Sequence, residues 1–239
     1  MRVAIVSDIH GNRTAFDAVL ADLRETSPDL ILHGGDLADS GSDGCYIVDT
    51  IRELGWQGVI GNTDEMLARP DSLERFAAAV PQMAALTPVI REMAAASREL
   101  LGDERVAWLG RLPMRQTVAG VGLVHASPAS AWRSPQPESG DADFEAAYSA
   151  ISEPVVVYGH VHRSFARKTG GRWIANSGSV SLSYDGDPRA SYLVIDDGVP
   201  AIRRVMYDVD AEVRALERRA SPHWEWPAKI LRAASPQMP

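Results

Sequence analysis

The sequence is poor in cysteine, in long apolar runs and in net positive charge. Cys45 is the only cysteine among 239 residues, so the chain has no disulfide framework of the kind that stabilises small secreted domains. The first apolar run is only a strand long and is followed at once by Asp8, which does not resemble a secretory signal. No run approaches the roughly 20 apolar residues that cross a bilayer. We therefore expect a cytoplasmic protein without a membrane role.

The charge balance is acidic, with a formal net charge of −8 at pH 7. Binding to a nucleic-acid backbone requires net or local basicity, so this balance argues against a nucleic-acid partner. An acidic excess is also what a carboxylate-rich metal site shows when its cations are not counted. The length of 239 residues and the hydrophobic fraction of 45% predict one large α/β domain with a substantial core.

The first predicted strand leads directly to two polar side chains. Residues 3–6 form a continuous apolar run, which indicates a strand buried on both faces. Asp8 and His10 follow it, with Gly11 behind them. Ligands bind at the carboxyl ends of strands in parallel α/β sheets, so both side chains are expected in one crevice. An oxygen donor beside a nitrogen donor suits Mn, Fe, Co or Zn, although Asp-x-His alone is equally consistent with a turn.

Similar side chains follow four later strands or tight glycine turns. The five predicted strands cover residues 3–6, 30–32, 57–60, 121–124 and 154–158. The seven candidate ligands that follow them are Asp8, His10, Asp36, Asn62, His125, His160 and His162. Two carboxylates, one amide and four imidazoles are too many donors for one metal and suit two. Buried without cations, each group would need a hydrogen-bond partner of its own, so we predict two cations and one bridging carboxylate.

The remaining segments predict helices, an insertion and a β-rich end. Helices are expected over residues 14–24, 47–54 and 142–151, and an apolar stripe predicts a C-terminal helix over residues 209–216. Strands are expected over residues 163–168, 172–175, 190–196 and 199–207. Residues 64–114 show helical spacing divided by Pro81 and Pro88, and we interpret them as a helical cap inserted over the pocket. A helical layer on the outer face of the sheet is the alternative. The aperiodic residues 126–140 are interpreted as a flap.

Taken in order, the motifs resemble those of the calcineurin-like binuclear metallophosphoesterases. The shared pattern is Asp8-Ile-His10, Gly35-Asp36, Gly61-Asn62, His125 and Gly159-His-Val-His162. Later motifs, Asn176-Ser-Gly-Ser-Val180 and Gly186-Asp-Pro-Arg-Ala-Ser-Tyr192, also resemble the small bacterial and archaeal phosphodiesterase branch, with Ser177 in place of a proline. The resemblance implies one domain over residues 1–239, built as a four-layer α/β/β/α sandwich of two mixed sheets.

The resemblance also implies the ligand sets of two divalent metal ions, which would be Mn, Fe, Ni or Zn. One metal would be held by Asp8, His10, Asp36 and His162, and the other by Asp36, Asn62, His125 and His160, so that Asp36 bridges them. The implied reaction is hydrolysis of a small or nucleotide-like phosphodiester, or of an activated phosphomonoester, by a hydroxide held between the metals.

Individual residues have candidate roles in catalysis and substrate binding, and alternative functions stay open. Asp36, Asn62 and His125 are the candidate catalytic residues, and Asn12, Arg133 and Arg163 are candidate contacts to a small-molecule phosphoester substrate. The alternatives are a metal-binding scaffold on the same fold, as in the retromer scaffold subunit, a protein phosphatase, and a nuclease.

The chain departs from the family pattern directly after Asn62. The family usually has a histidine there that protonates the leaving group, and this chain has Thr63. Threonine is not a useful general acid at neutral pH, so strong phosphomonoesterase activity is not expected. We interpret the neighbouring Asp64 as an orienting carboxylate and His33 as a hydrogen-bonded residue at a strand end.

Overall fold

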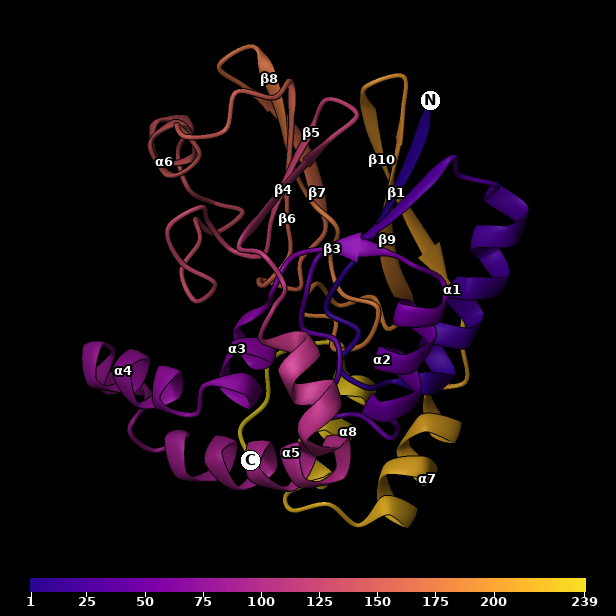
Figure 1. Cartoon of the computed structure of the whole chain (residues 1–239), viewed down its shortest axis with the longest axis vertical. Coiled ribbons are helices and arrows are strands. Elements are labelled where there is room, and N and C mark those ends of the chain that lie inside the picture. The colour runs from indigo at the N-terminus through magenta and orange to yellow at the C-terminus, as the bar shows by residue number, and fades with distance from the viewer.

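Two mixed five-stranded sheets form the centre of the computed structural model, which describes residues 1–239 (Figure 1). The first sheet has the strand order β10-β9-β1-β2-β3. Its strands are β1 (Arg2–Val6), β2 (Leu30–His33), β3 (Gln57–Gly58), β9 (Ala190–Asp196) and β10 (Val199–Val205). β1, β2 and β3 run parallel, so the loops that follow them leave the same edge of the sheet.

The second sheet has the strand order β4-β5-β6-β8-β7. Its strands are β4 (Arg115–Val118), β5 (Val121–Val124), β6 (Val155–Tyr158), β7 (Phe165–Thr169) and β8 (Arg172–Asn176). β5, β6 and β8 are parallel, whereas β4 and β7 are antiparallel edge strands. Both sheets are therefore mixed, as predicted.

Helices cover the outer faces of the two sheets, which completes four layers. α1 (Arg13–Thr26) packs against the first sheet beside α2 (Gly44–Glu53), and α6 (Asp141–Ala147) packs against the second (Figure 1). Between the sheets, Val3 and Ile5 of β1 join a buried apolar cluster with Leu123 and Val157 of the second sheet. The predicted α/β/β/α sandwich is confirmed.

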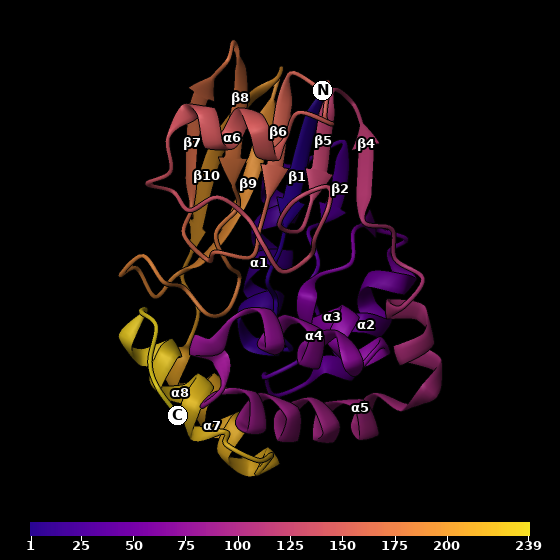
Figure 2. The same ribbon diagram turned by 90° about the vertical axis from the view of Figure 1, so that its left-hand side faces the viewer.

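A group of helices lies beyond the end of the sheets toward which β1 runs. In chain order they are α3 (Asn62–Ala68), α4 (Asp71–Ala79), the 3₁₀ turn Pro81–Met83 and α5 (Thr87–Leu109). Both views place them below the two sheets, next to the C-terminal helices (Figures 1 and 2). The backbone of α5 kinks at Gly102, where φ is +70°. Leu101 and Val106 pack into the core cluster beneath α1 and α2, whereas Ile90 and Met93 face a cavity.

Two elements were not expected from the sequence. β4 has the polar sequence Arg-Gln-Thr-Val, and a polar edge strand shows no apolar signal. α8 (Glu225–Ala233) contains Pro227 in its first turn and lies beyond the last helix expected from the sequence, over residues 209–216. It packs with α7 (Val209–Arg219) around Leu182. None of the helices combines the length and the apolarity that a membrane span requires.

His33 ends β2 in an apolar environment. It is fully buried, and neither ring nitrogen has a hydrogen-bond partner. The prediction that this histidine is hydrogen-bonded was therefore wrong, because the carbonyl groups around the strand end bond to backbone N–H groups instead, as His33 O does to Val59 N. Burial lowers the pKa of His33 to about 3.

This buried histidine predicts a specific acid sensitivity. The unfolded chain takes up a proton at His33 below about pH 6.5, whereas the folded chain does so only near the lowered pKa of about 3. The free energy of unfolding therefore falls as the pH falls between these two pKa values. His33→Leu removes this contribution. On going from pH 8 to pH 5, the free energy of unfolding of the variant should rise by about 2 kcal/mol relative to that of the parent protein. Urea unfolding of the chelated proteins measures the difference, and parallel pH curves would contradict it.

Candidate metal centre

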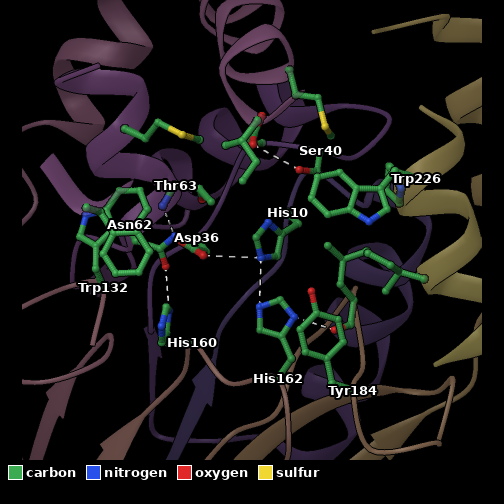
Figure 3. A pocket seen from close by; sticks show the side chains of 18 of the residues that line it. His10, Asp36, Ser40, Asn62, Thr63, Trp132, His160, His162, Tyr184 and Trp226 are labelled. Atoms are coloured by element: carbon green, nitrogen blue, oxygen red, sulfur yellow. Dashed lines mark hydrogen bonds and ion pairs between the residues drawn. The ribbon is translucent and has the colours of Figure 1, made fainter. Parts of the chain in front are cut away.

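The loops after β1, β2 and β6 bring four buried side chains together. Ligand atoms of Asp8, His10, Asp36 and His162 all lie within 4.8 Å of one another. His162 Nε2 is 3.1 Å from Asp8 Oδ1 and 3.2 Å from His10 Nε2. His10 Nε2 in turn is 3.6 Å from Asp36 Oδ2 (Figure 3). These spacings leave room for one cation among the four groups.

A second group of donors lies on the other side of Asp36. Asn62 Oδ1 is 3.0 Å from His125 Nε2 and 2.8 Å from His160 Nδ1. His125 Nε2 is 3.5 Å from Asp36 Oδ2, the same oxygen that faces His10. Asp36 is therefore shared by both groups. The structure brings together all seven side chains that the sequence singled out.

Unusual backbone conformations aim these side chains at the centre. Five of the seven have positive φ angles between 48° and 68°, namely Asp8, His10, Asp36, His160 and His162. Aspartate and histidine adopt this region more readily than most residues, but each instance costs of order 1–3 kcal/mol. Backbone hydrogen bonds between the loop after β1 and the loop after β2 hold this geometry. They run from Asp8 N to Gly35 O (3.0 Å) and from His10 N to Asp36 O (2.9 Å). Such strain is typical of functional sites.

Backbone carbonyl groups fix the orientation of two imidazoles. The Nδ1–H group of His162 donates to Leu182 O at 2.6 Å, and that of His125 donates to Gly34 O at 2.8 Å. A neutral ring then directs its Nε2 lone pair at the centre, where Asp8 and Asp36 present only oxygen acceptors. Acceptors that converge in this way need a positive charge between them, so the residues present fit divalent cations.

Burial and charge shift the pKa values of this cluster in opposite directions. Burial alone would lower the pKa of His162, but the adjacent Asp8 carboxylate outweighs burial and raises it. Burial would raise the pKa of Asp8, and the His162 imidazole reverses that effect and lowers it overall. For His160, burial and then His125 lower the pKa to about 4. The Asp8 carboxylate thus stays ionised and attracts positive charge.

Helix α3 supports the Asp36 carboxylate that the two groups of donors share. The Thr63 backbone N–H donates to Asp36 Oδ1 at 2.8 Å, which leaves Oδ2 to face the two groups of donors. Asp64 is fully buried and accepts hydrogen bonds from the backbone N–H groups of Asp36 (2.8 Å), Leu37 (2.9 Å) and Gly61 (3.0 Å). Burial and the nearby Asp36 raise the pKa of Asp64 to about 7. Asp64 therefore positions the backbone that carries Asp36.

A cavity of about 290 Å³ opens onto the centre. Its floor includes His10, Asp36 and Asn62. Its walls come from separate segments. Phe76 of α4 and Ile90 of α5 line it. Trp132 of the 126–140 segment and Trp226 of α8 also line it (Figure 3). The first three lie in the segments that we interpreted from the sequence as a cap and a flap, but no local pattern marks them individually. Trp226 and the buried Asp39 were not expected at the site.

The three predicted substrate contacts do not line this cavity. Asn12 is buried, caps α1 by accepting from Ala15 N (2.9 Å), and donates to Ser181 Oγ (3.1 Å). Arg163 forms an ion pair with Glu138. Arg133 lies over the ring of Phe76, 6.0 Å from its centroid, in a shallow pocket next to the cavity. A role in substrate binding stays a prediction for all three.

Gly159 gives a test of how tightly the ligand loops pack. A Cβ atom there would lie 2.4 Å from both Asp8 Oδ2 and Ser7 Oγ. Gly159→Ala should therefore displace Asp8, reduce bound metal and lower the free energy of unfolding by about 1–3 kcal/mol. The matched control is Gly140→Ala, whose Cβ would meet nothing nearer than 3.6 Å. Metal content and thermal unfolding of both variants check this, and a Gly159→Ala protein that matches the control would contradict it.

The fold and the centre together define a two-sheet protein whose strand-end carboxylates and imidazoles suit divalent cations. Residues 1–197 match the family model described as the calcineurin-like phosphoesterase superfamily domain. The chain therefore belongs to the calcineurin-like phosphoesterase superfamily, and the family indicated by the sequence motifs is confirmed.

Similar proteins come from bacteria and archaea. The uncharacterized protein MJ0912 of Methanocaldococcus jannaschii is 26% identical over 245 residues, covering 93% of this chain and 94% of that protein. The crystal structure of a metallophosphoesterase from Sphaerobacter thermophilus has a TM-score of 0.80 and 26% identity, covering 98% of this chain and 99% of its own. The hypothetical protein PH1004 from Pyrococcus horikoshii shares the fold, with a TM-score of 0.85, 16% identity and 99% coverage of both chains.

Proposed function

We propose that this protein is a hydrolase that cleaves small phosphoesters with two divalent metal ions. The observation that carries the proposal is the position of Asp36 Oδ2, which lies 3.6 Å from His10 Nε2 and 3.5 Å from His125 Nε2 and so joins two separate groups of donors. A pair of bound cations would acidify a water molecule between them and clamp the phosphoryl oxygens for in-line attack.

The residues of the chain would divide the binding of the two ions between them. Asp8, His10, Asp36 and His162 would hold one ion, and Asp36, Asn62, His125 and His160 the other. The carbonyl groups of Leu182 and Gly34 fix the ligand rings, and the Thr63 N–H fixes the bridging carboxylate. Because little rearrangement is needed, binding energy can be used to position the phosphoester.

The helices of residues 64–114 and the flap of residues 126–140 would act as a cap. Phe76, Ile90 and Met93 from the first segment and Trp132 from the second line the cavity above the ligands. The alternative, a helical layer on the outer face of the sheet, draws support from Leu101 and Val106 in the C-terminal part of α5, which are buried in the core cluster. As a cap, these segments would exclude bulk water from the phosphoryl group, which strengthens the electrostatic interactions there.

The test is hydrolysis by chelated protein reloaded with Mn²⁺, Fe²⁺, Ni²⁺ or Zn²⁺. We expect no turnover of bis(4-nitrophenyl) phosphate without metal and turnover after reloading, with bound metal measured in the same samples. A panel of phosphomonoesters, cyclic nucleotides, dinucleoside polyphosphates and a phosphopeptide covers other substrate classes. Two tightly bound ions without turnover of any ester would contradict the proposal and favour a metal-binding scaffold.

A further inference from the structure

The cavity above the metal centre has largely apolar walls and no lysine or arginine side chain. Its lining contains histidine, carboxylate, aromatic and aliphatic residues, but neither lysine nor arginine. Arg163 is paired with Glu138, and Arg133 lies outside beside Phe76. Any negative charge that a ligand carries must therefore be neutralised at the metal centre, because the walls cannot neutralise it.

Two tryptophans form fixed platforms within this cavity. The Trp132 ring stacks on Phe76 with centroids 4.8 Å apart and planes 29° apart, and its Nε1–H donates to Glu65 Oε2 at 2.8 Å. The Trp226 Nε1–H donates to Gln237 O at 2.7 Å. Both indoles are thus held in place before a ligand binds, which limits the entropy that binding would cost.

The two platforms lie on opposite sides of the metal centre. In Figure 3, Trp132 is on one side and Trp226 on the other, with Asp36 and His10 between them. A phosphorus atom placed at the centre would have one platform on each side. A ligand with organic groups in two directions from phosphorus matches this arrangement, whereas a phosphomonoester would leave one platform bare.

We propose that the site takes a phosphodiester with two small, flat apolar arms, one seated on the Trp132–Phe76 pair and the other against Trp226. The proposal rests on the proposed function and names the substrate class of that site. A cavity of about 290 Å³ is at the lower end of the range for small-molecule sites, which favours arms of about one ring each. A flat ring can stack on an indole whichever polar groups the ring carries.

Charge balance supports a ligand with a single negative charge. Two divalent cations would bring four positive charges, and the carboxylates of Asp8, Asp36 and Asp39 lie in or beside the cavity. Asp39 is almost fully buried, and its Oδ1 atom has no hydrogen-bond partner. With the hydroxide of the proposed reaction, these groups already offset the four positive charges. A phosphodiester then adds only one negative charge, whereas every further phosphate adds another without a counterpart in the cavity walls. The site should therefore discriminate against polyphosphate chains.

Esters that share one leaving group test the two arms. We compare bis(4-nitrophenyl) phosphate, methyl 4-nitrophenyl phosphate and 4-nitrophenyl phosphate on the metal-loaded protein. After correction for its two identical leaving groups, the bis-aryl ester should have a kcat/KM about 10-fold above that of the methyl ester. Diadenosine tetraphosphate should be a poorer substrate than the bis-aryl ester.

Two variants assign the arms to the platforms. Trp132→Ala and Trp226→Ala should each lower kcat/KM for the bis-aryl ester by about 10-fold. For the methyl ester, kcat/KM should fall only in the variant that lacks the tryptophan under the nitrophenyl arm. The other tryptophan has no ring to stack on in this ester, so its loss should have no effect. The matched control is Trp173→Ala, because Trp173 lies on β8 and does not line the cavity.

Binding of diphenyl phosphate gives a readout that does not depend on turnover. Calorimetry should show weaker binding in both cavity variants, and dimethyl phosphate should bind poorly throughout. Equal kcat/KM for the methyl and bis-aryl esters, two variants that behave like Trp173→Ala, or a preference for diadenosine tetraphosphate would overturn the inference. If no ester is hydrolysed but diphenyl phosphate binding still requires both tryptophans, the proposed function fails and the two-armed site stands.

Discussion

Asp36→Asn should abolish hydrolysis and release at least one of two bound metal ions. The asparagine can still accept the hydrogen bond from Thr63 N at Oδ1, so the loop keeps its anchor. At the Oδ2 position, however, it loses the negative charge and places an NH₂ group between His10 and His125. Loss of a partner that only supports a ligand typically costs 10–100-fold, so loss of a shared ligand should lower kcat/KM by more than about 100-fold.

The control for this variant is Asp197→Asn, which removes the same charge from an exposed residue in the turn between β9 and β10, where it pairs with the N-terminal amino group. It should leave metal content and rate unchanged. Circular dichroism and thermal unfolding show whether the Asp36→Asn protein is folded, and elemental analysis gives its metal content. A folded Asp36→Asn protein that keeps two metals and most of the rate would rule out the shared carboxylate.

Thr63→His should speed the hydrolysis of esters with poor leaving groups and leave good ones nearly unchanged. Thr63 lines the cavity, and its buried hydroxyl has no hydrogen-bond partner, so a side chain at this position faces the reacting group. The hydroxyl cannot protonate a departing alkoxide at neutral pH, a contribution typically of about 10²–10⁴-fold. The natural protein should therefore show a steep dependence of rate on leaving-group pKa.

A series of aryl and alkyl diesters assayed on both proteins measures that dependence. Thr63→His should flatten it, and Thr63→Asn, which is polar but not acidic, should not. His33 and Asp64 lie close to the site in the sequence but are unsuited to replace the acid, because neither lines the cavity and Asp64 accepts from three backbone N–H groups. If the natural protein already shows a flat dependence with chemistry rate-limiting, another group that faces the cavity supplies the proton, and Asp39 and Tyr184 are then the candidates.

The ligand cluster could be predicted from the sequence because each part of it is a local pattern. A short apolar strand followed by a turn with aspartate or histidine is visible within about ten residues, as in Val3–His10. Parallel strands then bring the turns to one edge, so Asp8 and Asp36 meet although 28 positions separate them. Their positive φ angles follow from the same tight turns.

The individual residues of the cavity walls could not be predicted, although two of their segments were interpreted as a cap and a flap, because the residues are brought together by tertiary packing alone. Phe76, Trp132 and Trp226 come from three segments that share no motif, and each is an ordinary apolar residue in its local sequence. Arg163 fitted a phosphate-binding role by its position beside His162, but Glu138 from the flap pairs with it. Such a pairing across 25 positions leaves no trace in the sequence. The polar edge strand β4 was missed for a similar reason, since only its neighbour β5 makes it a strand.

The most direct test of the two-metal account is a titration of chelated protein with Mn²⁺ in which bound metal and diester hydrolysis are followed together. The shared position of Asp36 predicts that both groups of donors must be filled. Hydrolysis of bis(4-nitrophenyl) phosphate should stay near background up to one equivalent and rise as the second ion binds. Full activity at one bound ion per chain, or two bound ions without activity, would contradict the account.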